Sequence, residues 1–361
     1  MLSGSPVGCI TQKQEVIAMK AAYLTEWKKL GVAELPVPQI LDGESLIRVS
    51  YAGICGSDVH IFEGNHPTAK APMIMGHEFV GTVERISGDT KDGIKVGDRV
   101  TAYPLISCGR CSACQEGNPH VCRSLKLLGI HTNGGFAEYV AVQTKALVKV
   151  DVQLSDQVAA LSEPFAVGVH VNERAGIREG STVLIIGGGP IGLICGMVAR
   201  YNGAGQIVYS EINPERIAQI KAFGFPDVID PKSEDANART ATLTDDRGFD
   251  VVLEVSGSQP GLIFSTQACA IRGTIVPVGF PGKRPEFDIL QCIFKELSLV
   301  GSRVYSFAHF TKAVRMLEDM VISGIADPSK LISDVYPVAE SQQALQKMVD
   351  GRNLGKILIK M

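Results

Sequence analysis

Four side chains could together hold a catalytic metal ion. Cys55 offers a thiolate, His77 an imidazole and Glu78 a carboxylate, and Glu163 offers a second carboxylate far downstream. Three such ligands with one open position are what a catalytic zinc needs to bind a substrate oxygen. A single cysteine or histidine is more often a core residue. The glycines around Cys55 and His77 favour the metal site, because they let the backbone approach a bound group closely.

A second group of cysteines has the spacing of a closed metal site. Four thiolates from one short, turn-rich stretch can surround a zinc ion tetrahedrally and leave no room for substrate. The alternative is a pair of disulfides, but nothing in the sequence indicates an oxidising compartment. We therefore predict a structural zinc that folds its own loop. Its ligands are Cys108, Cys111, Cys114 and Cys122.

A glycine-rich turn in the middle of the chain is typical of dinucleotide binding. An apolar run breaks into Gly187-x-Gly189-x-x-Gly192 and resumes as an apolar helix. The glycines turn the chain, admit the pyrophosphate and allow close helix packing. Glu211 ends the next predicted strand, where a carboxylate accepts both adenosine ribose hydroxyls and opposes a 2′-phosphate. This predicts NAD rather than NADP, the alternative being that Glu211 is a solvated loop residue.

With these groups in place, the chain resembles the zinc-dependent medium-chain alcohol dehydrogenases, nearest the branch of sorbitol (polyol), threonine and butanediol dehydrogenases. The resemblance spans residues 20 to 361. Besides the four-cysteine loop and the dinucleotide turn, it is carried by Gly76-His77-Glu78 with Gly81, by 96–100 and by 134–139. It implies that Cys55, His77 and a glutamate hold the catalytic zinc.

The resemblance also assigns a proton path and cofactor contacts. Ser57 and His60 match the hydroxyl and histidine positions that relay the substrate proton, and Asp58 is expected to orient the ring of the zinc-bound histidine. As alternatives, Ser57 and Asp58 are a turn pair that caps a local helix, and His60 is a surface residue. The further residues expected near cofactor or substrate are Pro190, Ile191, Arg216, Arg303 and Tyr305.

The substrate class is implied by one position. Glu163 stands where classical alcohol dehydrogenases carry a second cysteine, which is the pattern of the polyol branch. Whether Glu78 or Glu163 contacts the zinc directly stays open. The branch implies a polyol or sugar-derived secondary alcohol, with L-threonine or 2,3-butanediol as alternatives, and a homotetramer or homodimer.

The elements that must position these residues fall into two groups. Up to residue 150, short segments alternate apolar and polar side chains, which indicates a β-barrel-like catalytic domain, and the family resemblance implies that it is GroES-like. After it, strands and helices alternate, which indicates a doubly wound parallel (Rossmann) sheet in an α/β protein. This group has predicted helices at 191–201, 214–223, 261–270 and 310–323 and predicted strands at 183–186, 207–210, 251–255, 274–278 and 297–301. The expected catalytic domain is 19–170 with 306–361, the cofactor domain 171–305, and an N-terminal extension 1–18.

Composition and charge narrow the classes of function. The 361 residues are 45% hydrophobic, enough for two cores, and a net charge of −3 without a basic tract argues against nucleic-acid binding. No apolar run has the length of a membrane helix and no secretory leader is evident, so we expect a cytoplasmic protein without a membrane partner. We predict an enzyme with two zinc ions per chain that transfers a hydride between a small alcohol and NAD. The alternative class is a non-catalytic zinc-binding module.

Overall fold

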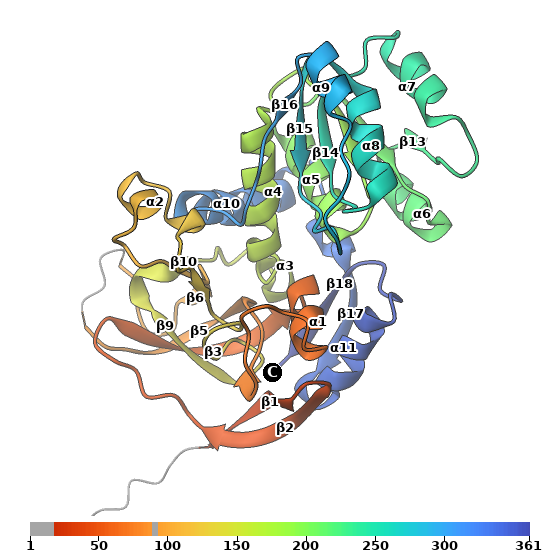
Figure 1. The fold of residues 1–361 in the computed structure, drawn as a ribbon. Helices are drawn as coiled ribbons and strands as arrows, with labels where there is room; N and C mark the ends of the chain where they lie inside the picture. Colours follow the sequence, from red (N-terminus) through yellow and green to blue (C-terminus); the bar gives the residue numbers. More distant parts are fainter. Residues whose placement is uncertain (1–17, 89–92) are drawn as a thin grey trace, which may run out of the picture.

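The computed structural model describes residues 18–88 and 93–361. In Figure 1 the chain forms two lobes, one built mainly of strands from the N-terminal half together with the last strands, the other a sheet flanked by helices. The predicted extension 1–18 lies outside the described residues except for Ala18, which begins β1. No helix in the described ranges is both long enough and apolar enough to cross a bilayer.

The first lobe, called the barrel lobe, is built on two sheets. The larger has seven strands, in the order β10-β6-β5-β3-β18-β17 with β9 added on β3, and the smaller has the order β2-β1-β4. Their buried faces share one hydrophobic cluster, as expected for sheets with one apolar face. The strands are β1 (Ala18–Glu26), β2 (Lys29–Pro36), β3 (Glu44–Gly53), β4 (Met73–Ile74), β5 (Glu78–Ile86), β6 (Arg99–Ala102), β9 (Tyr139–Gln143), β10 (Leu147–Lys149), β17 (Ile332–Pro337) and β18 (Lys356–Lys360).

The C-terminal strand lies beside the residues that follow β3. β18 pairs antiparallel with β3, with Leu358 opposite Gly53, and the N–H of Ile54 donates to the carbonyl of Ile357 at 2.9 Å. This register brings Lys356, the first residue of β18, to the turn where α1 begins. The helical segments of this lobe are α1 (Gly56–Phe62), η2 (Thr144–Ala146), η3 (Pro328–Leu331), η4 (Val338–Glu340) and α11 (Ser341–Val349).

A small zinc-loop lobe, residues 105–127, extends from the barrel. Its two strands, β7 (Leu105–Ile106) and β8 (Lys126–Leu127), pair antiparallel and enclose α2 (Ser112–Gln115) and η1 (Pro119–Val121). Among the described residues, its core has three buried members, Leu105, Cys122 and Leu125. So small a core needs an additional cross-link to hold its loop.

The second lobe, called the parallel-sheet lobe, confirms the predicted doubly wound sheet. Its six strands lie in the order β13-β12-β11-β14-β15-β16 and all pair in parallel, with helices on both faces (Figure 1). The order reverses between β11 and β14, and ligands of such sheets bind at the carboxyl ends of the strands at this reversal. The strands are β11 (Thr182–Ile186), β12 (Gln206–Ser210), β13 (Val228–Ile229), β14 (Phe249–Glu254), β15 (Cys269–Pro277) and β16 (Ser298–Leu299). The helices are α3 (Asp156–Ala159), α4 (Ser162–Ala175), α5 (Pro190–Tyr201), α6 (Pro214–Ala222), α7 (Ala236–Thr244), α8 (Gln259–Ala268), α9 (Ile289–Phe294) and α10 (Phe307–Ser323).

Some predicted elements have different limits. The helix predicted at 261–270 ends at Ala268, because Cys269 already pairs with Phe249 in the sheet. The strand predicted at 297–301 is reduced to the two residues of β16. Helices α4 and α10 share one hydrophobic cluster with β11 and α5, so a single core continues across residues 170 and 306. The domain boundaries at these positions stay a prediction.

Candidate metal centres and dinucleotide site

Cys55, His77 and Glu78 come together where β3 ends and β5 begins. Cys55 is the N-cap residue of α1, and Glu78 is the first residue of β5. One ligand atom of each lies within 4.8 Å of the other two. Gly53 pairs with Glu78 across the two strands, and a Cβ at Gly53 would lie 2.3 Å from Glu78 Oε2. Only glycine therefore leaves room for the carboxylate at this position.

This donor set fits a zinc ion. A thiolate, an imidazole and a carboxylate are ligands that zinc takes in catalytic sites. His77 Nδ1 is buried and has no hydrogen-bond partner among the described residues, although buried polar atoms normally have one. Cys55 is partly exposed, so the site is open to a small molecule on the cysteine side.

Asp58 lies beside two of these ligands, Cys55 and His77. Its Oδ2 accepts a hydrogen bond from the N–H of Cys55 at 2.9 Å, which confirms the helix-capping interpretation of this residue. Its Oδ1 lies 3.9 Å from His77 Nδ1, close to the ring but beyond hydrogen-bond distance. The side chain is fully buried, and burial raises the pKa of its carboxyl.

Lys356 brings a positive charge into the same site. Its ammonium lies 2.6 Å from Glu78 Oε1 and 2.5 Å from Oε2, and it donates to the carbonyl of Ile54 at 2.9 Å. Burial lowers the pKa of Lys356, but the neighbouring carboxylate of Glu78 outweighs burial and leaves this pKa above its usual value. Lys356 is therefore a buried cation. Nothing in the sequence distinguishes it from other strand lysines, and sequence reasoning missed it.

Glu163 lies at the start of α4, buried beside the cluster but held by a different partner. The hydroxyl of Tyr305 donates to Glu163 Oε1 at 2.6 Å, and Tyr305 is fully buried. Burial raises the pKa of Glu163 to about 7. The cluster of donors found in the described residues contains Glu78 and not Glu163. The geometry therefore places Glu78 with Cys55 and His77, and within the described residues Glu163 Oε2 has no hydrogen-bond partner.

The predicted proton path lies on α1. Ser57 Oγ is buried and has no hydrogen-bond partner in the described part of the chain. His60 follows three residues later, in the last turn of the helix, and is exposed. Residues three apart lie on one face of a helix. The structure therefore places a hydroxyl near the metal ligands and an imidazole at the surface, while their roles stay predictions.

The four cysteines of the zinc-loop lobe form the second cluster. The Sγ atom of Cys111 lies 3.5 Å from that of Cys114 and 3.9 Å from that of Cys122, and the Sγ atoms of Cys108 and Cys114 are 4.0 Å apart. Hydrogen bonds from the N–H groups of Arg110 and Cys111 lower the pKa of Cys108 to about 6, which favours the thiolate. Four converging thiols without a disulfide fit a closed tetrahedral zinc site.

The glycine turn between β11 and α5 has the geometry of a phosphate site. Gly187 has a φ of +106°, a conformation that favours glycine. Gly189 is the N-cap residue of α5 and Pro190 its first residue, so the free N–H groups of this helix face the turn. A Cβ at Gly192 would lie 2.0 Å from the carbonyl oxygen of Gly187, so no other residue fits. Ile191 is the second residue of the helix.

Glu211 and Arg216 flank this turn. Glu211 is buried, and its Oε2 accepts a hydrogen bond from the N–H of Gly188 at 2.7 Å. The Nε atom of Arg216 is buried and unpaired within the described residues, and Arg216 Nη1 lies 3.9 Å from where a Cβ of Gly189 would be. Arg303 is exposed beyond β16, and within the described chain it forms no hydrogen bond or ion pair with a predicted site residue.

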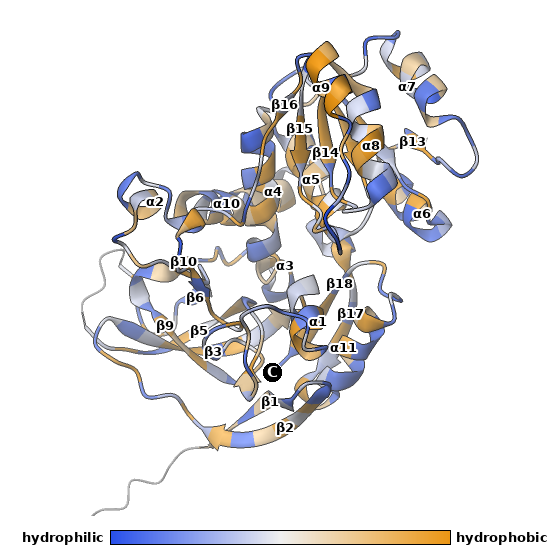
Figure 2. Cartoon of the chain, viewed as in Figure 1, coloured by the Kyte–Doolittle hydropathy of each residue, from blue (hydrophilic) through white to orange (hydrophobic). Residues whose placement is uncertain are grey.

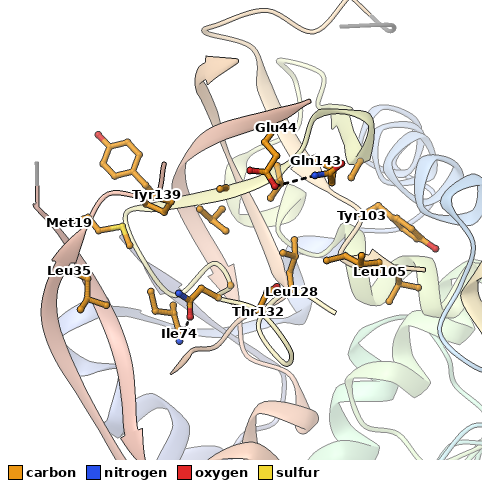
Figure 3. A pocket seen from close by; sticks show the side chains of 18 of the residues that line it. Met19, Leu35, Glu44, Ile74, Tyr103, Leu105, Leu128, Thr132, Tyr139 and Gln143 are labelled. Carbon is orange, nitrogen blue, oxygen red and sulfur yellow. Dashed lines mark hydrogen bonds between the residues drawn. The ribbon is translucent and has the colours of Figure 1, made fainter. Parts of the chain in front are cut away.

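A separate cavity of about 920 Å³ lies between the barrel lobe and the zinc-loop lobe (Figure 3). Its lining is largely apolar and comes from β1, β9, β7 and the start of α10, with Met19, Tyr139 and Leu105 among the residues. Glu44 and Gln143 hydrogen-bond to each other at 3.1 Å on one side. None of the predicted ligands or cofactor contacts lines it.

Two family models match the chain. The model described as alcohol dehydrogenase GroES-like domain matches residues 41–152, and the one described as zinc-binding dehydrogenase matches 190–319. The sorbitol dehydrogenase of Bacillus subtilis (strain 168) is 33% identical over 342 residues, which cover 93% of this chain and 95% of the relative. The chain belongs to the zinc-dependent medium-chain alcohol dehydrogenase family. The GroES-like barrel predicted for the first lobe is thereby confirmed.

Solved structures extend the likeness to the whole dehydrogenase. L-idonate 5-dehydrogenase from Escherichia coli K-12 is 30% identical with a TM-score of 0.86, covering 96% of this chain and 99% of that one. An alcohol dehydrogenase from Escherichia coli CFT073, complexed with NADH, is 28% identical with a TM-score of 0.86, covering 95% and 99%. The protein is a zinc-dependent oxidoreductase of alcohols, and zinc and a nicotinamide dinucleotide are its cofactors. The family assignment favours an enzyme over a non-catalytic zinc-binding module.

Proposed function

We propose that this dehydrogenase oxidises a secondary alcohol of a polyol or sugar-derived substrate, with NAD as the hydride acceptor. The observation that carries the substrate class is the second buried carboxylate beside the metal ligands. The hydroxyl of Tyr305 donates to Glu163 Oε1, so Oε2 is available to accept a hydrogen bond from a substrate. A substrate with a second hydroxyl next to the reacting one can donate that bond, whereas a simple alcohol cannot.

Residues around the metal cluster are suited to separate roles in the reaction. Zinc, when held by Cys55, His77 and Glu78, supplies a Lewis acid that lowers the pKa of the substrate hydroxyl. Ser57 Oγ lies buried without a protein partner and is suited to accept the proton that leaves this hydroxyl. His60, on the same face of α1 and exposed, is suited to pass the proton to solvent.

The preference for NAD rests on Glu211. Its buried carboxylate lies beside the glycine turn, where the adenosine ribose of a bound dinucleotide is held. A 2′-phosphate in that position would meet the same negative charge. Arg216 lies on the opposite side of the turn and is suited to the shared pyrophosphate.

The test combines turnover with metal analysis. Formation of reduced dinucleotide is measured with sugar alcohols, sugar acids, L-threonine and 2,3-butanediol, using NAD and NADP, beside a zinc count on the same preparation. We expect turnover of a polyol or sugar acid with NAD. Turnover of L-threonine alone would refute the substrate class, and equal use of NADP would refute the role of Glu211.

The role of Glu163 has a sharper test. Glu163→Gln keeps the shape of the side chain and removes its charge. It should lower kcat/KM for the best polyol by about tenfold or more, since a hydrogen bond to a charged group is worth about 1.5–3 kcal/mol. A secondary alcohol without a second hydroxyl is the matched control, and its kcat/KM should change much less. Equal losses of kcat/KM with both substrates would show that Glu163 does not bind the second hydroxyl.

We also propose that the dehydrogenase is a homo-oligomer assembled through α9 and β16. Ile289, Ile293 and Phe294 of α9 are 61%, 63% and 77% exposed, and Leu299 of β16 is 54% exposed. In Figure 2 the ribbon of α9, at the outer end of the lobe, is coloured mainly as hydrophobic. β16 is the edge strand of its sheet, so its outer backbone groups are free to pair with a second copy. So large an exposed apolar patch is typical of an interface.

Light scattering on a sizing column tests this surface. Phe294→Glu should reduce the mass of the assembly, because it places a charge in the apolar patch. Val152→Glu is the matched control, because Val152 is 85% exposed and lies between β10 and α3, outside the patch. This variant should leave the mass unchanged. A Phe294→Glu variant with the wild-type mass would refute this interface.

The proposal of a cytoplasmic location is supported by the thiols. All eight cysteines in the described residues are free, and the two clusters they contribute to suit metal rather than disulfides. Such clusters persist where thiols are kept reduced. Fractionation of cells that express the tagged chain would test the location, and recovery outside the cytoplasm would refute it.

A further inference from the structure

The metal cluster brings several buried acidic groups together. Asp58, Glu78 and Glu163 are 0%, 1% and 7% exposed, and the thiol of Cys55 becomes a fourth negative group as a zinc ligand. Buried charges are costly unless they are paired. Before a metal ion arrives, an arrangement of this kind needs a positive charge from the protein itself.

Lys356 is suited to supply that charge. It is the one lysine or arginine with a buried side chain in the part of the chain that the structure describes. Its ammonium donates hydrogen bonds to Glu78 Oε1 and to the carbonyl of Ile54, and it forms an ion pair with Glu78 Oε2. The residue lies on β18, whose pairing with β3 holds it beside the turn to Cys55.

The position of Lys356 also opposes a bound cation. A ligand atom of Glu78 lies within 4.8 Å of those of Cys55 and His77, and both Glu78 oxygens lie within 2.6 Å of the ammonium. An ion at the cluster must therefore share Glu78 with Lys356, and two positive charges close together in a buried site repel each other strongly. The same ammonium stabilises the empty site and weakens the loaded one.

We propose that Lys356 is a positioning residue that acts as a built-in counter-cation of the metal site. It holds Glu78 in place while the site is empty, so that the ion can be loaded into an already folded protein, and it lowers the affinity of the site for zinc. This inference rests on the proposed assignment of Cys55, His77 and Glu78 as zinc ligands. It does not depend on the substrate.

The experiment compares zinc affinity and stability of the metal-free protein. Lys356→Met removes the charge and keeps the length of the side chain, and Lys356→Arg keeps the charge as the matched control. Zinc is withdrawn from each purified enzyme with graded concentrations of a chelator, and the melting temperature of the metal-free form is recorded. Cobalt is also substituted for zinc, because its absorption spectrum distinguishes the one-thiolate site from the four-thiolate site.

We expect Lys356→Met to hold the zinc of this site at least tenfold more tightly than the wild type, while its metal-free form melts at a lower temperature. Lys356→Arg should resemble the wild type in both measurements. Zinc affinity that is unchanged or weaker in Lys356→Met, or an unchanged melting temperature of its metal-free form, would overturn the proposal.

A second variant covers the case in which Lys356→Met does not fold. Glu78→Gln combined with Lys356→Met removes one negative and one positive charge together. If charge balance is the role of Lys356, the double variant should fold and recover the metal-free melting temperature of the wild type. A double variant that also fails to fold would show that Lys356 acts through packing. A wild type that binds zinc only at the four cysteines would refute the site assignment itself.

Discussion

Tyr305→Phe removes one hydroxyl from the active site and little else. Tyr305 is fully buried, its hydroxyl donates to Glu163 Oε1 at 2.6 Å, and its ring stacks on Phe310 with centroids 6.0 Å apart. Phenylalanine keeps the ring and the stacking. A hydrogen bond to a charged group contributes about 1.5–3 kcal/mol, so the zinc-loaded variant should lose about this much stability. At about 2–4 °C per kcal/mol, the melting temperature should fall by about 3–12 °C.

The assay is a double-mutant cycle of thermal unfolding. Wild type, Tyr305→Phe, Glu163→Gln and the double variant are melted under the same conditions at about pH 9, where Glu163, whose pKa is raised to about 7, is ionised. In the Glu163→Gln background the hydroxyl meets a neutral amide, so removing it should cost only about 0.5–1.5 kcal/mol. A Tyr305→Phe variant that melts within about 1 °C of the wild type, or equal losses in both backgrounds, would refute the idea that this bond holds a charged Glu163.

Three further predictions concern other parts of the molecule. Cys111→Ser should leave one zinc per chain and make the loop at 105–127 sensitive to protease, whereas Cys292→Ser, outside both clusters, should keep two zinc ions and a resistant loop. Burial, reinforced by neighbouring histidines, lowers the pKa of His170 to about 4, so the unfolded chain takes up this proton first as pH falls below about 6.5. The free energy of unfolding should therefore fall as the pH is lowered from about 6.5 to 4. In thermal melting at about pH 5, His170→Gln should lose about 1–2 kcal/mol less than the wild type. Identical pH profiles of the two proteins would exclude this histidine as a cause. Glu211→Ala should raise KM for NAD about tenfold or more and lower KM for NADP, because the carboxylate that opposes the 2′-phosphate is gone, and parallel changes in both would remove Glu211 from the ribose.

The parts of the site that sequence reasoning predicted are those in which the chemistry is local. Gly187 and Gly192 touch within one turn, where a Cβ at the second would meet the carbonyl of the first. The four cysteines lie in one short loop whose sulfur atoms can converge without help from distant elements. Residue type and spacing are enough in such cases, because the chain between the groups is too short to allow many arrangements.

The lysine and tyrosine partners of the two carboxylates could not be predicted in this way. Lys356 is 278 positions from Glu78, and Tyr305 is 142 positions from Glu163. The predicted place of Tyr305 near the cofactor or substrate stays a prediction, and the structure adds that its hydroxyl donates to Glu163. Neither position carries a local pattern that names its partner.

The sequence by itself determined the kinds of site in this dehydrogenase: an open metal cluster, a four-thiol loop and a dinucleotide turn in an α/β chain. These follow from the chemistry of the side chains and from short-range geometry. Only the tertiary structure decided which groups pair with the carboxylates of the open cluster. Glu78 lies beside the other ligands and pairs with Lys356, and Glu163 accepts a hydrogen bond from Tyr305. The reason is that the pairing of β18 with β3 and the packing of the segment before α10 against α4 bring these groups together, and both are properties of the assembled core.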